Sequence, residues 1–447
     1  MSIFSKLSVE LEDEEIVSRK STIDPIEQLF EHYKNRLLSE ANLDQLNKLP
    51  AHQKRKKIED LVNQMIQQEK VVLSQVNKEK LMLMVIHDSV GLGPLESLLK
   101  DDEVTEIMVN GPNEIYIEKN GQISLTHVEF KNNEHIRHII DRIVAPIGRR
   151  IDESSPLVDG RLQDGSRINA VIPPIALNGP VLTIRKFKKD PFTMQDLISF
   201  GALDDKMARF LEACIASKSN VLISGGTGSG KTTLLNVLSI FIPQGERIIT
   251  IEDMAELKLN RRNVISLEAR PTNMEGTGEI TIRQLVKNAL RMRPDRIIVG
   301  EVRGEEVLDM LQAMNTGHEG SLTTIHANNP KDAMSRLEAM VIMSNPAMTT
   351  EVVRPYIASA LDIVVQTMRL SDGTRKIVSI AELIKEHDTI ALKEIFRFNR
   401  TGVNFHGKVQ GAFQATGYVP NIIKKLQVYG QGLSEDFFND LVGVDKP

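Results

Sequence analysis

Apolar positions in the first part of the chain recur at helical spacing. Residues 1–24 come first and are charged and aperiodic, which predicts a flexible tail. Within residues 25–84, apolar side chains then repeat with the period of amphipathic helices, so we expect a short helical bundle whose stripes bury one another. The stripes are Ile26, Leu29, Phe30, Tyr33, Leu37 and Leu38; Ile58, Leu61, Val62, Met65 and Ile66; and the run Leu81–Ile86.

The pattern changes at Gly91–Pro94, which indicates a second domain over residues 85–190. Glu106–Asn110 and Ile115–Lys119 are typical of strands, and Asn120-Gly121 suits a hairpin turn because both residues tolerate a positive φ. A helix follows, and the whole predicts a small α+β domain, PAS-like in plan. The helix is marked by Ile136, Ile139, Ile140, Ile143, Val144 and Ile147.

Strand-like and helix-like runs alternate through residues 206–447, after a hinge linker predicted over 191–205. Such alternation predicts an α/β domain with a mostly parallel sheet and helices on both faces. Leu370–Thr374 is typical of a turn between two strands, and residues 399–447, with little apolar periodicity, form a C-terminal extension. The predicted strands are Asn220–Ser224, Arg247–Ile251, Asn263–Leu267, Arg296–Val299 and Ser321–Ile325.

One segment of this domain carries a complete phosphate-binding pattern, G-x-x-x-x-G-K-[ST]. A strand precedes it and an apolar helix follows, so its backbone N–H groups and the helix dipole point at one anion. We expect Lys231 to bridge the β- and γ-phosphates of ATP and the Thr232 hydroxyl to ligate Mg²⁺. A glycine-rich turn without a ligand is the less favoured interpretation. The expected nucleotide-binding residues are Gly225, Gly226, Thr227, Gly228, Ser229, Gly230, Lys231, Thr232 and Thr233.

Two carboxylates follow predicted strands of the same sheet. Glu252 comes after Arg247–Ile251 and Glu301 after Arg296–Val299. Ligands of open α/β sheets lie at these strand ends, so both carboxylates are candidates to act on the γ-phosphate, with Glu301 also near Mg²⁺ through the nucleotide. A helix cap or a surface charge is the alternative for each. Because Gly300 stands where a simple Walker B pattern has Asp, Glu301 must carry that role alone.

Histidines follow in the segment Thr316–Asn329. His326 closes a predicted strand and could donate a hydrogen bond to the γ-phosphate, and His318 is grouped with the nucleotide-binding residues. A metal site is disfavoured because no neighbouring cysteine or third histidine completes a tetrahedral set. Cys214 is the only cysteine, which excludes an intramolecular disulfide and a four-cysteine zinc site.

Composition narrows the possible partners of this 447-residue chain, which is long enough for two or three domains. The net charge is −5, aromatic residues make up 4%, and tryptophan is absent. A RecA-like nucleic-acid motor needs basic and aromatic surface, so we expect no stable nucleic-acid partner. No run reaches the ~18 apolar residues of a membrane span, and the acidic start does not resemble a signal peptide. We therefore expect a cytoplasmic protein that reaches a membrane only by docking.

Four segments then occur in a recognisable order: the phosphate-binding loop, Thr250–Leu257, Arg293–Arg303 and the histidine segment. They resemble the Walker A, Asp box, Walker B and His box of the type II/IV secretion ATPases. The finer resemblance, over roughly residues 80–440, is to the tight-adherence (Flp) pilus assembly ATPases of the CpaF family. It depends on Gly91–Glu96, Glu106–Gly111, Ser155–Arg161, Leu290–Pro294 and Ile395–Phe398.

This resemblance implies a RecA-like ATPase domain and a homohexamer with nucleotide between the N-terminal and RecA-like domains. Hydrolysis would drive domain closure and move a pilus platform protein of the inner membrane, with the ATPase docked at its inner face. The missing zinc module argues against the type II secretion and type IV pilus extension branches. An ATPase of conjugative type IV secretion stays open as an alternative. A non-hydrolysing nucleotide-binding scaffold is disfavoured by the complete motifs.

Charge that builds on the γ-phosphate in the transition state also needs positive neighbours, for which an arginine finger is a usual source. Arg161, Arg167 and Arg185 of the predicted α+β domain are the candidates. In the family that the chain resembles, arginines of the corresponding segments reach the nucleotide when the two domains close. Salt bridges to surface carboxylates are the alternative role.

Overall fold

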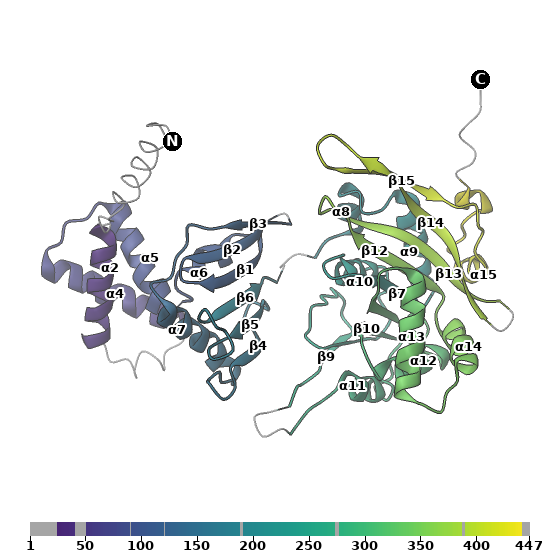
Figure 1. Cartoon of the computed structure of the whole chain (residues 1–447), viewed down its shortest axis with the longest axis horizontal. Helices are drawn as coiled ribbons and strands as arrows, with labels where there is room; N and C mark the ends of the chain where they lie inside the picture. The colour runs from purple at the N-terminus through teal and green to yellow at the C-terminus, as the bar shows by residue number, and fades with distance from the viewer. Residues whose placement is uncertain are drawn as a thin grey trace, which may run out of the picture. The chain divides into compact units, whose positions relative to one another are not determined.

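The computed structural model describes residues 25–40, 51–89, 91–119, 121–187, 191–272, 277–386 and 389–439. The predicted flexible tail over residues 1–24 lies outside them. The chain divides into two compact units, Met1–Lys188 and Lys189–Pro447 (Figure 1). Among the described helices, none combines the length and the apolar character that crossing a bilayer requires.

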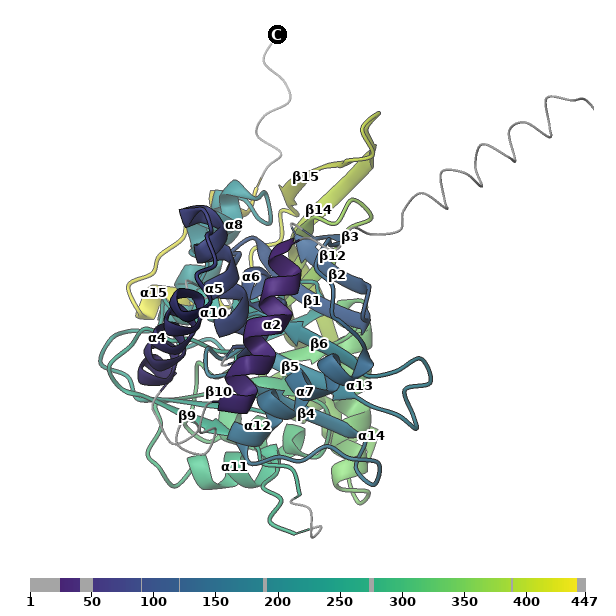
Figure 2. The ribbon, with the colours of Figure 1, turned by 90° about the vertical axis from the view of Figure 1, so that its left-hand side faces the viewer.

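Helices α2 (Pro25–Glu40), α4 (Ala51–Glu69) and α5 (Gln75–Ser89) form where the apolar stripes predict helices, and they pack side by side (Figures 1 and 2). Tyr33, Val62 and Val85 are fully buried in their shared core. Asp88, near the end of α5, forms ion-pair contacts with Lys34 Nζ at 2.7 Å and with His135 Nε2 at 3.0 Å. Burial opposes ionisation of this carboxyl, but these two partners lower its pKa overall, so it remains charged.

The rest of the first unit is built on an antiparallel sheet, which has six strands within the described residues, in the order β3-β2-β1-β6-β5-β4. Helices α6 (Leu95–Lys100) and α7 (Asn133–Val144) and the short η1 (Ala145–Ile147) accompany it, and isoleucines of α7 pack on one sheet face. The strands are β1 (Val104–Gly111), β2 (Glu114–Lys119), β3 (Gln122–Leu125), β4 (Leu157–Arg161), β5 (Arg167–Val171) and β6 (Val181–Arg185).

The second unit holds a mixed sheet, with nine strands in the part of the chain that the structure describes, ordered β15-β14-β13-β12-β7-β11-β10-β8-β9. Pairing is parallel from β12 to β9 and antiparallel from β12 to β15. The strands are β7 (Val221–Gly225), β8 (Ile248–Glu252), β9 (Val264–Glu268), β10 (Arg296–Val302), β11 (Leu322–His326), β12 (Ile363–Arg369), β13 (Arg375–Glu386), β14 (Thr389–Val403) and β15 (Val409–Ala415).

The prediction of a mostly parallel sheet is therefore right only up to β12. Residues 370–374 join β12 to β13 and residues 404–408 join β14 to β15, and such short connections can link only antiparallel neighbours, whereas parallel pairing needs a longer crossover. The weak periodicity of residues 399–447 also hides regular structure: β15, α15 (Ile423–Val428) and η2 (Glu435–Phe438) lie there. Phe438 is fully buried, and the buried Glu382 carboxylate accepts hydrogen bonds from the Asn421 and Ile422 amides.

Helices cover both faces of this sheet, and each face has its own apolar core. In β7, Val221 and Ile223 face one core while Leu222 faces the other, which explains the unbroken apolar run of that strand. Segment 191–205, predicted as a linker, contains α8, whose Met194 and Leu197 join the first core. The first face carries α8 (Met194–Ser199), α9 (Asp205–Ala216), α10 (Lys231–Ser239) and α15; the second carries α11 (Ile282–Ala289), α12 (Glu306–Asn315), α13 (Pro330–Ser344) and α14 (Thr350–Ala360).

Candidate active site

The phosphate-binding loop runs from the end of β7 at Gly225 to the start of α10 at Lys231. Gly228 and Gly230 have φ values of 67° and 96°, a backbone conformation that residues with a Cβ rarely adopt. The Lys231 ammonium donates to the Gly225 and Gly226 carbonyls at 3.0 and 3.1 Å, so it lies over the loop. Thr232 and Thr233 follow in the first turn of α10. The strand–loop–helix arrangement that an anion cradle needs is present.

Strand β12 packs against the base of this loop. Thr367 Oγ1 lies 2.9 Å from Ser229 Oγ and donates to the Ser224 carbonyl at 3.2 Å. A Cβ at Gly225 would stand 2.3 Å from Thr367 Oγ1, so only glycine fits at this point between β7 and β12. Thr367 is separated from Ser229 by 138 residues, and no motif in the sequence marks it as part of the site.

Glu252 lies at the carboxyl end of β8 and is 4% exposed. Its carboxylate accepts hydrogen bonds from the Glu256 amide at 3.0 Å and the Leu257 amide at 3.2 Å, which orient it and anchor the loop after β8. A Cβ at Gly300 would stand 2.8 Å from the Cγ of Glu252. The side chain of Glu252 therefore occupies the space above Gly300, which explains why no aspartate stands at that position.

Glu301 leaves the neighbouring strand β10 through an irregularity in its pairing. Between Val299 and Val302 the register with β11 shifts, as in a β-bulge, and Thr324 Oγ1 donates to the Gly300 carbonyl at 2.7 Å. A bulge turns a side chain away from the regular alternation of a strand. At this bulge the Glu301 side chain departs from the regular alternation of β10, at the sheet edge where β7 leads into the loop.

Charged partners hold Glu301 at this edge. Arg303 donates to Glu301 Oε2 from Nη2 at 2.5 Å and from Nε at 3.0 Å, and its Nη1 lies 3.2 Å from Asp253. The hydrogen bond and charge of Glu301 raise the pKa of Arg303, against the effect of its burial. One guanidinium therefore links carboxylates from the ends of β8 and β10.

His326 lies between Glu301 and the phosphate-binding loop. In the parallel pairing of β11 with β7 it lies opposite Gly225. Its Nε2 is 3.5 Å from Thr227 Oγ1 and its Nδ1 is 3.9 Å from Glu301 Oε1. Burial, together with the charge of Lys231, lowers the pKa of His326 below its ordinary value, so the ring is neutral at pH 7. A neutral ring can donate one hydrogen bond and accept another.

His318 lies away from this cluster within the chain, and the expectation that it takes part in nucleotide binding stays a prediction. It precedes β11, whereas the loop follows the far end of the parallel strand β7. A strand of five residues places the two ends about 16 Å apart. The His318 amide donates to Ala313, and its carbonyl accepts from Ser321, so local turn structure accounts for its position.

The three candidate arginines form one row across the first unit's sheet. Arg161 on β4 is directly opposite Arg167 on β5, which is opposite Arg185 on β6, and Arg185 is opposite Glu106 on β1. Residues directly opposite in antiparallel pairs share a face, and the adjoining Ile168 and Ile184 are buried on the other, core face. Like charges side by side oppose stability, and the ion pair of Arg185 Nε with Glu106 Oε1 at 3.8 Å offsets part of this repulsion.

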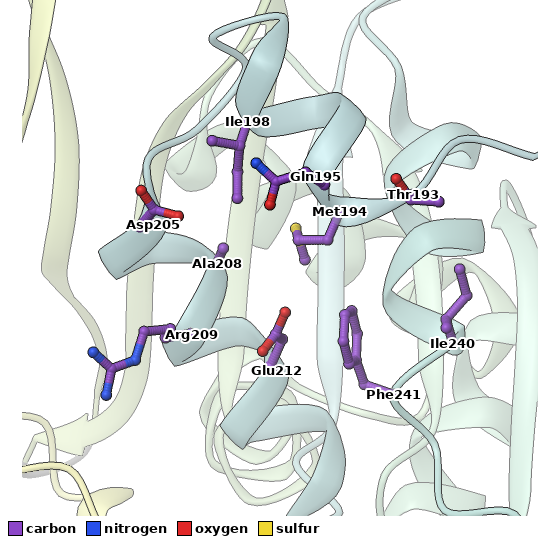
Figure 3. A pocket seen from close by; sticks show the side chains of 10 residues that line it. All are labelled: Thr193, Met194, Gln195, Ile198, Asp205, Ala208, Arg209, Glu212, Ile240 and Phe241. Atoms are coloured by element: carbon purple, nitrogen blue, oxygen red, sulfur yellow. The ribbon is translucent and has the colours of Figure 1, made fainter.

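A cavity of about 370 Å³ lies elsewhere in the second unit, between α8, α9 and the residues after α10 (Figure 3). Ile240 and Phe241 form part of its wall, and Arg209 and Glu212 of α9 lie at its side. The loop is at the start of α10 and the cavity is at its end, about 13 Å along a nine-residue helix. This cavity is therefore not the nucleotide site.

Comparison with known proteins assigns the chain to a protein family. The family described as Type II/IV secretion system protein matches residues 88–407. The chain belongs to this family. Its site is that of a P-loop ATPase. Conjugal transfer protein TrbB of Rhizobium radiobacter is 32% identical over 307 residues, covering 68% of this chain and 91% of TrbB. An uncharacterised protein of Methanocaldococcus jannaschii is 49% identical over 239 residues, covering 52% of this chain and 33% of its own length.

Solved structures of lower similarity also match. The VirB11 ATPase of the Brucella suis type IV secretion system, in complex with sulphate, is 28% identical with a TM-score of 0.35, covering 64% of this chain and 94% of that one. The pilus retraction motor PilT with bound ADP is 21% identical with a TM-score of 0.48, covering 66% of this chain and 81% of that one.

The close packing at Gly300 gives a test of the active-site geometry. Gly300→Ala forces Glu252 from its place above the strand, and a shift of about 1 Å at an active site can cost about 100-fold in rate. We expect ATP turnover to fall at least tenfold while the melting temperature changes little. Gly245→Ala is the matched control, because a Cβ there meets no described atom within 4 Å. Equal turnover in the two variants would contradict the packing argument.

Proposed function

We propose that this ATPase of the type II/IV secretion family is a hexameric motor that couples ATP hydrolysis to the movement of protein subunits in a membrane-associated machine. The observation that supports this most is the position of His326 between Glu301 and the phosphate-binding loop. It brings a carboxylate, a neutral histidine and a lysine to the edge of the sheet where a γ-phosphate would lie.

The residues present suit ATP with Mg²⁺. The Thr232 hydroxyl and the Glu301 carboxylate are oxygen donors, which Mg²⁺ prefers, and the phosphates would complete its coordination. When bound, the ion would supply positive charge that offsets the charge of the phosphate oxygens. Lys231 and the loop amides would bind the phosphates, and Glu301 would orient the attacking water. Arg303 holds the Glu301 carboxylate by two hydrogen bonds, and the His326 ring lies beside it, with Nδ1 3.9 Å from Oε1.

The arginine row of the first unit is the proposed second half of the active site. Arg161, Arg167 and Arg185 share one sheet face, and Arg185 lies four positions before Lys189, where the second unit begins. Planar guanidinium groups bind phosphate oxygens bidentately, so this row is suited to the charge that develops on a γ-phosphate. We propose that closure of the PAS-like domain on the ATPase domain within a homohexamer brings the row to the nucleotide.

Two kinds of membrane-associated machine are candidates for the one that this ATPase drives. Segments such as Gly91–Glu96 and Ser155–Arg161 favour a tight-adherence pilus, with an inner-membrane platform protein as partner and the ATPase docked at the membrane's inner face. The relative TrbB, named for conjugal transfer, favours a conjugative-type secretion system. Both share the motor chemistry, and neither candidate requires a stable contact between this chain and nucleic acid.

Exchanges in the phosphate-binding loop and at Glu301 test the proposed hydrolysis. Glu301→Gln retains the shape but removes the charge that orients water, so we expect nucleotide affinity within about twofold and turnover reduced about 100-fold or more. Lys231→Ala removes the cation from the loop, and we expect it to weaken binding and abolish turnover. Steady-state ATPase assays and titration with a fluorescent ADP analogue measure both quantities. Wild-type turnover in Lys231→Ala would refute the ATPase site.

The arginine row can be tested in assembled rings. The arginines would act on charge that develops in the transition state. Arg167→Ala and Arg185→Ala should therefore each reduce turnover by about 1,000-fold while nucleotide affinity changes much less. Arg161→Ala should have an equal or smaller effect, and lysine should substitute poorly since it lacks the planar fork. Arg150→Ala, which removes an exposed arginine of the same unit outside the row, is the matched control. Parent rates in all three row variants would exclude closure of the first unit as the step that completes the site.

Deletion of the gene in the source organism separates the two machines. A tight-adherence motor predicts loss of surface pili with unchanged DNA transfer, and complementation with the Glu301→Gln variant should fail to restore pili. Electron microscopy counts the pili, and a mating assay measures transfer. Loss of transfer with intact pili would favour the conjugative alternative instead.

A further inference from the structure

Two arginines from the strand pair β12–β13 lie beside the phosphate-binding loop, although no nucleotide-binding motif includes them. Arg369 and Arg375 are directly opposite each other in the antiparallel pairing. Arg375 Nε donates to the Gly228 carbonyl at 2.9 Å across 147 residues of sequence. A Cβ on Gly228 would stand 3.8 Å from Nη1 of Arg369. The loop therefore has a cationic neighbour on the side of β12 and β13.

The Arg375 contact fixes the orientation of one peptide unit of the loop. In a trans peptide the carbonyl oxygen and the N–H of the next residue point in opposite directions. Gly228 O faces Arg375, so the Ser229 N–H points away from it, and its contact with Gly226 O is long, at 3.4 Å. Because this hydrogen bond is long and weak, the Ser229 N–H can readily donate to a phosphate oxygen instead.

Because residue 228 is glycine, the peptide unit between Gly228 and Ser229 needs contacts from other strands to keep its orientation. Gly228 has a φ of 67°, and a residue with no Cβ rotates its neighbouring peptide units at little cost. Ser229 is held at its side chain by Thr367 of β12 and at the preceding carbonyl by Arg375 of β13. These contacts hold the amide of Ser229 from both ends.

The turn that precedes Arg375 is itself well anchored. Asp372 accepts hydrogen bonds from the Thr374 amide at 3.0 Å, from the Thr374 hydroxyl at 2.6 Å and from the Val409 amide at 2.9 Å. Although burial opposes ionisation, these bonds lower the pKa of Asp372 to about 2, so it is charged at neutral pH. The Asp372 carboxylate thus ties this turn to the start of β15.

We propose that Arg375 is a positioning residue for nucleotide binding. By holding the Gly228 carbonyl on the outer side of the loop, it keeps the Ser229 amide directed at the phosphate chain. Arg375 acts through the peptide unit and need not touch the phosphates. The inference depends on the proposed nucleotide binding at the loop and adds to it a residue from the C-terminal strands.

Nucleotide affinity is the quantity that this role should change. We expect Arg375→Gln to raise the Kd for a fluorescent Mg-ADP analogue and the KM for ATP by about threefold to tenfold, a modest effect because the contact is solvent-exposed. The kcat should change less than about twofold, and the melting temperature should not change. Asp372→Asn, which loosens the turn and retains the arginine, should produce a smaller loss of affinity. Arg397→Gln, an exposed arginine on β14, is the matched control.

The outcomes distinguish this inference from the proposed function. Failure of the unmodified full chain to bind the analogue would refute the nucleotide site as a whole. Binding by the parent chain with Kd values in Arg375→Gln and Asp372→Asn equal to that of Arg397→Gln would overturn only the role of Arg375. A lower melting temperature with unchanged Kd and KM would also overturn it, because Arg375 would then be a structural support alone.

Discussion

Parallel pairing of β7, β11, β10 and β8 is the constraint on which the site depends. It brings the carboxyl ends of these strands to one edge of the sheet, in an order different from their order in the chain. The phosphate-binding loop continues β7, His326 ends β11, and Glu301 and Glu252 come from β10 and β8. Residues that are distant in sequence become neighbours because each strand ends at the same level. The chemistry of the edge therefore follows from hydrogen bonds made in the core.

Close packing of backbone against backbone sets the second constraint. Gly225 lies against Thr367 of one neighbouring strand, and Gly300 lies under the Glu252 side chain of another. At both positions a methyl group would have to displace a residue of the site. The same crowding at Gly300 accompanies the register shift that releases Glu301 from the sheet. Glycine here allows two acidic residues to share one end of two adjacent strands, where a larger side chain would separate them.

Sequence analysis predicted the parallel strands and the phosphate-binding loop well, because apolar runs and glycine spacing are local signals. Family membership is confirmed, whereas the roles of Glu252, Glu301, His326 and the arginines remain predictions. His318 lies at the end of β11 opposite to the loop, and its expected role in nucleotide binding also remains a prediction. The C-terminal strands were underestimated because β14 and β15 are half-exposed, with polar residues among the apolar ones. Thr367 and Arg375 could not be found, as nothing local to them signals the loop.

The mixed character of the sheet has a consequence for the loop. β7 has parallel neighbours on both sides, but only β12 continues into an antiparallel set of strands. Acidic residues approach the loop from the β11, β10 and β8 side, and Thr367, Arg369 and Arg375 approach it from the β12 and β13 side. The antiparallel strands return close to the loop through a short turn, which a parallel crossover would not do. The strands that break the predicted pattern thus provide a set of contacts to the loop that a purely parallel sheet would lack.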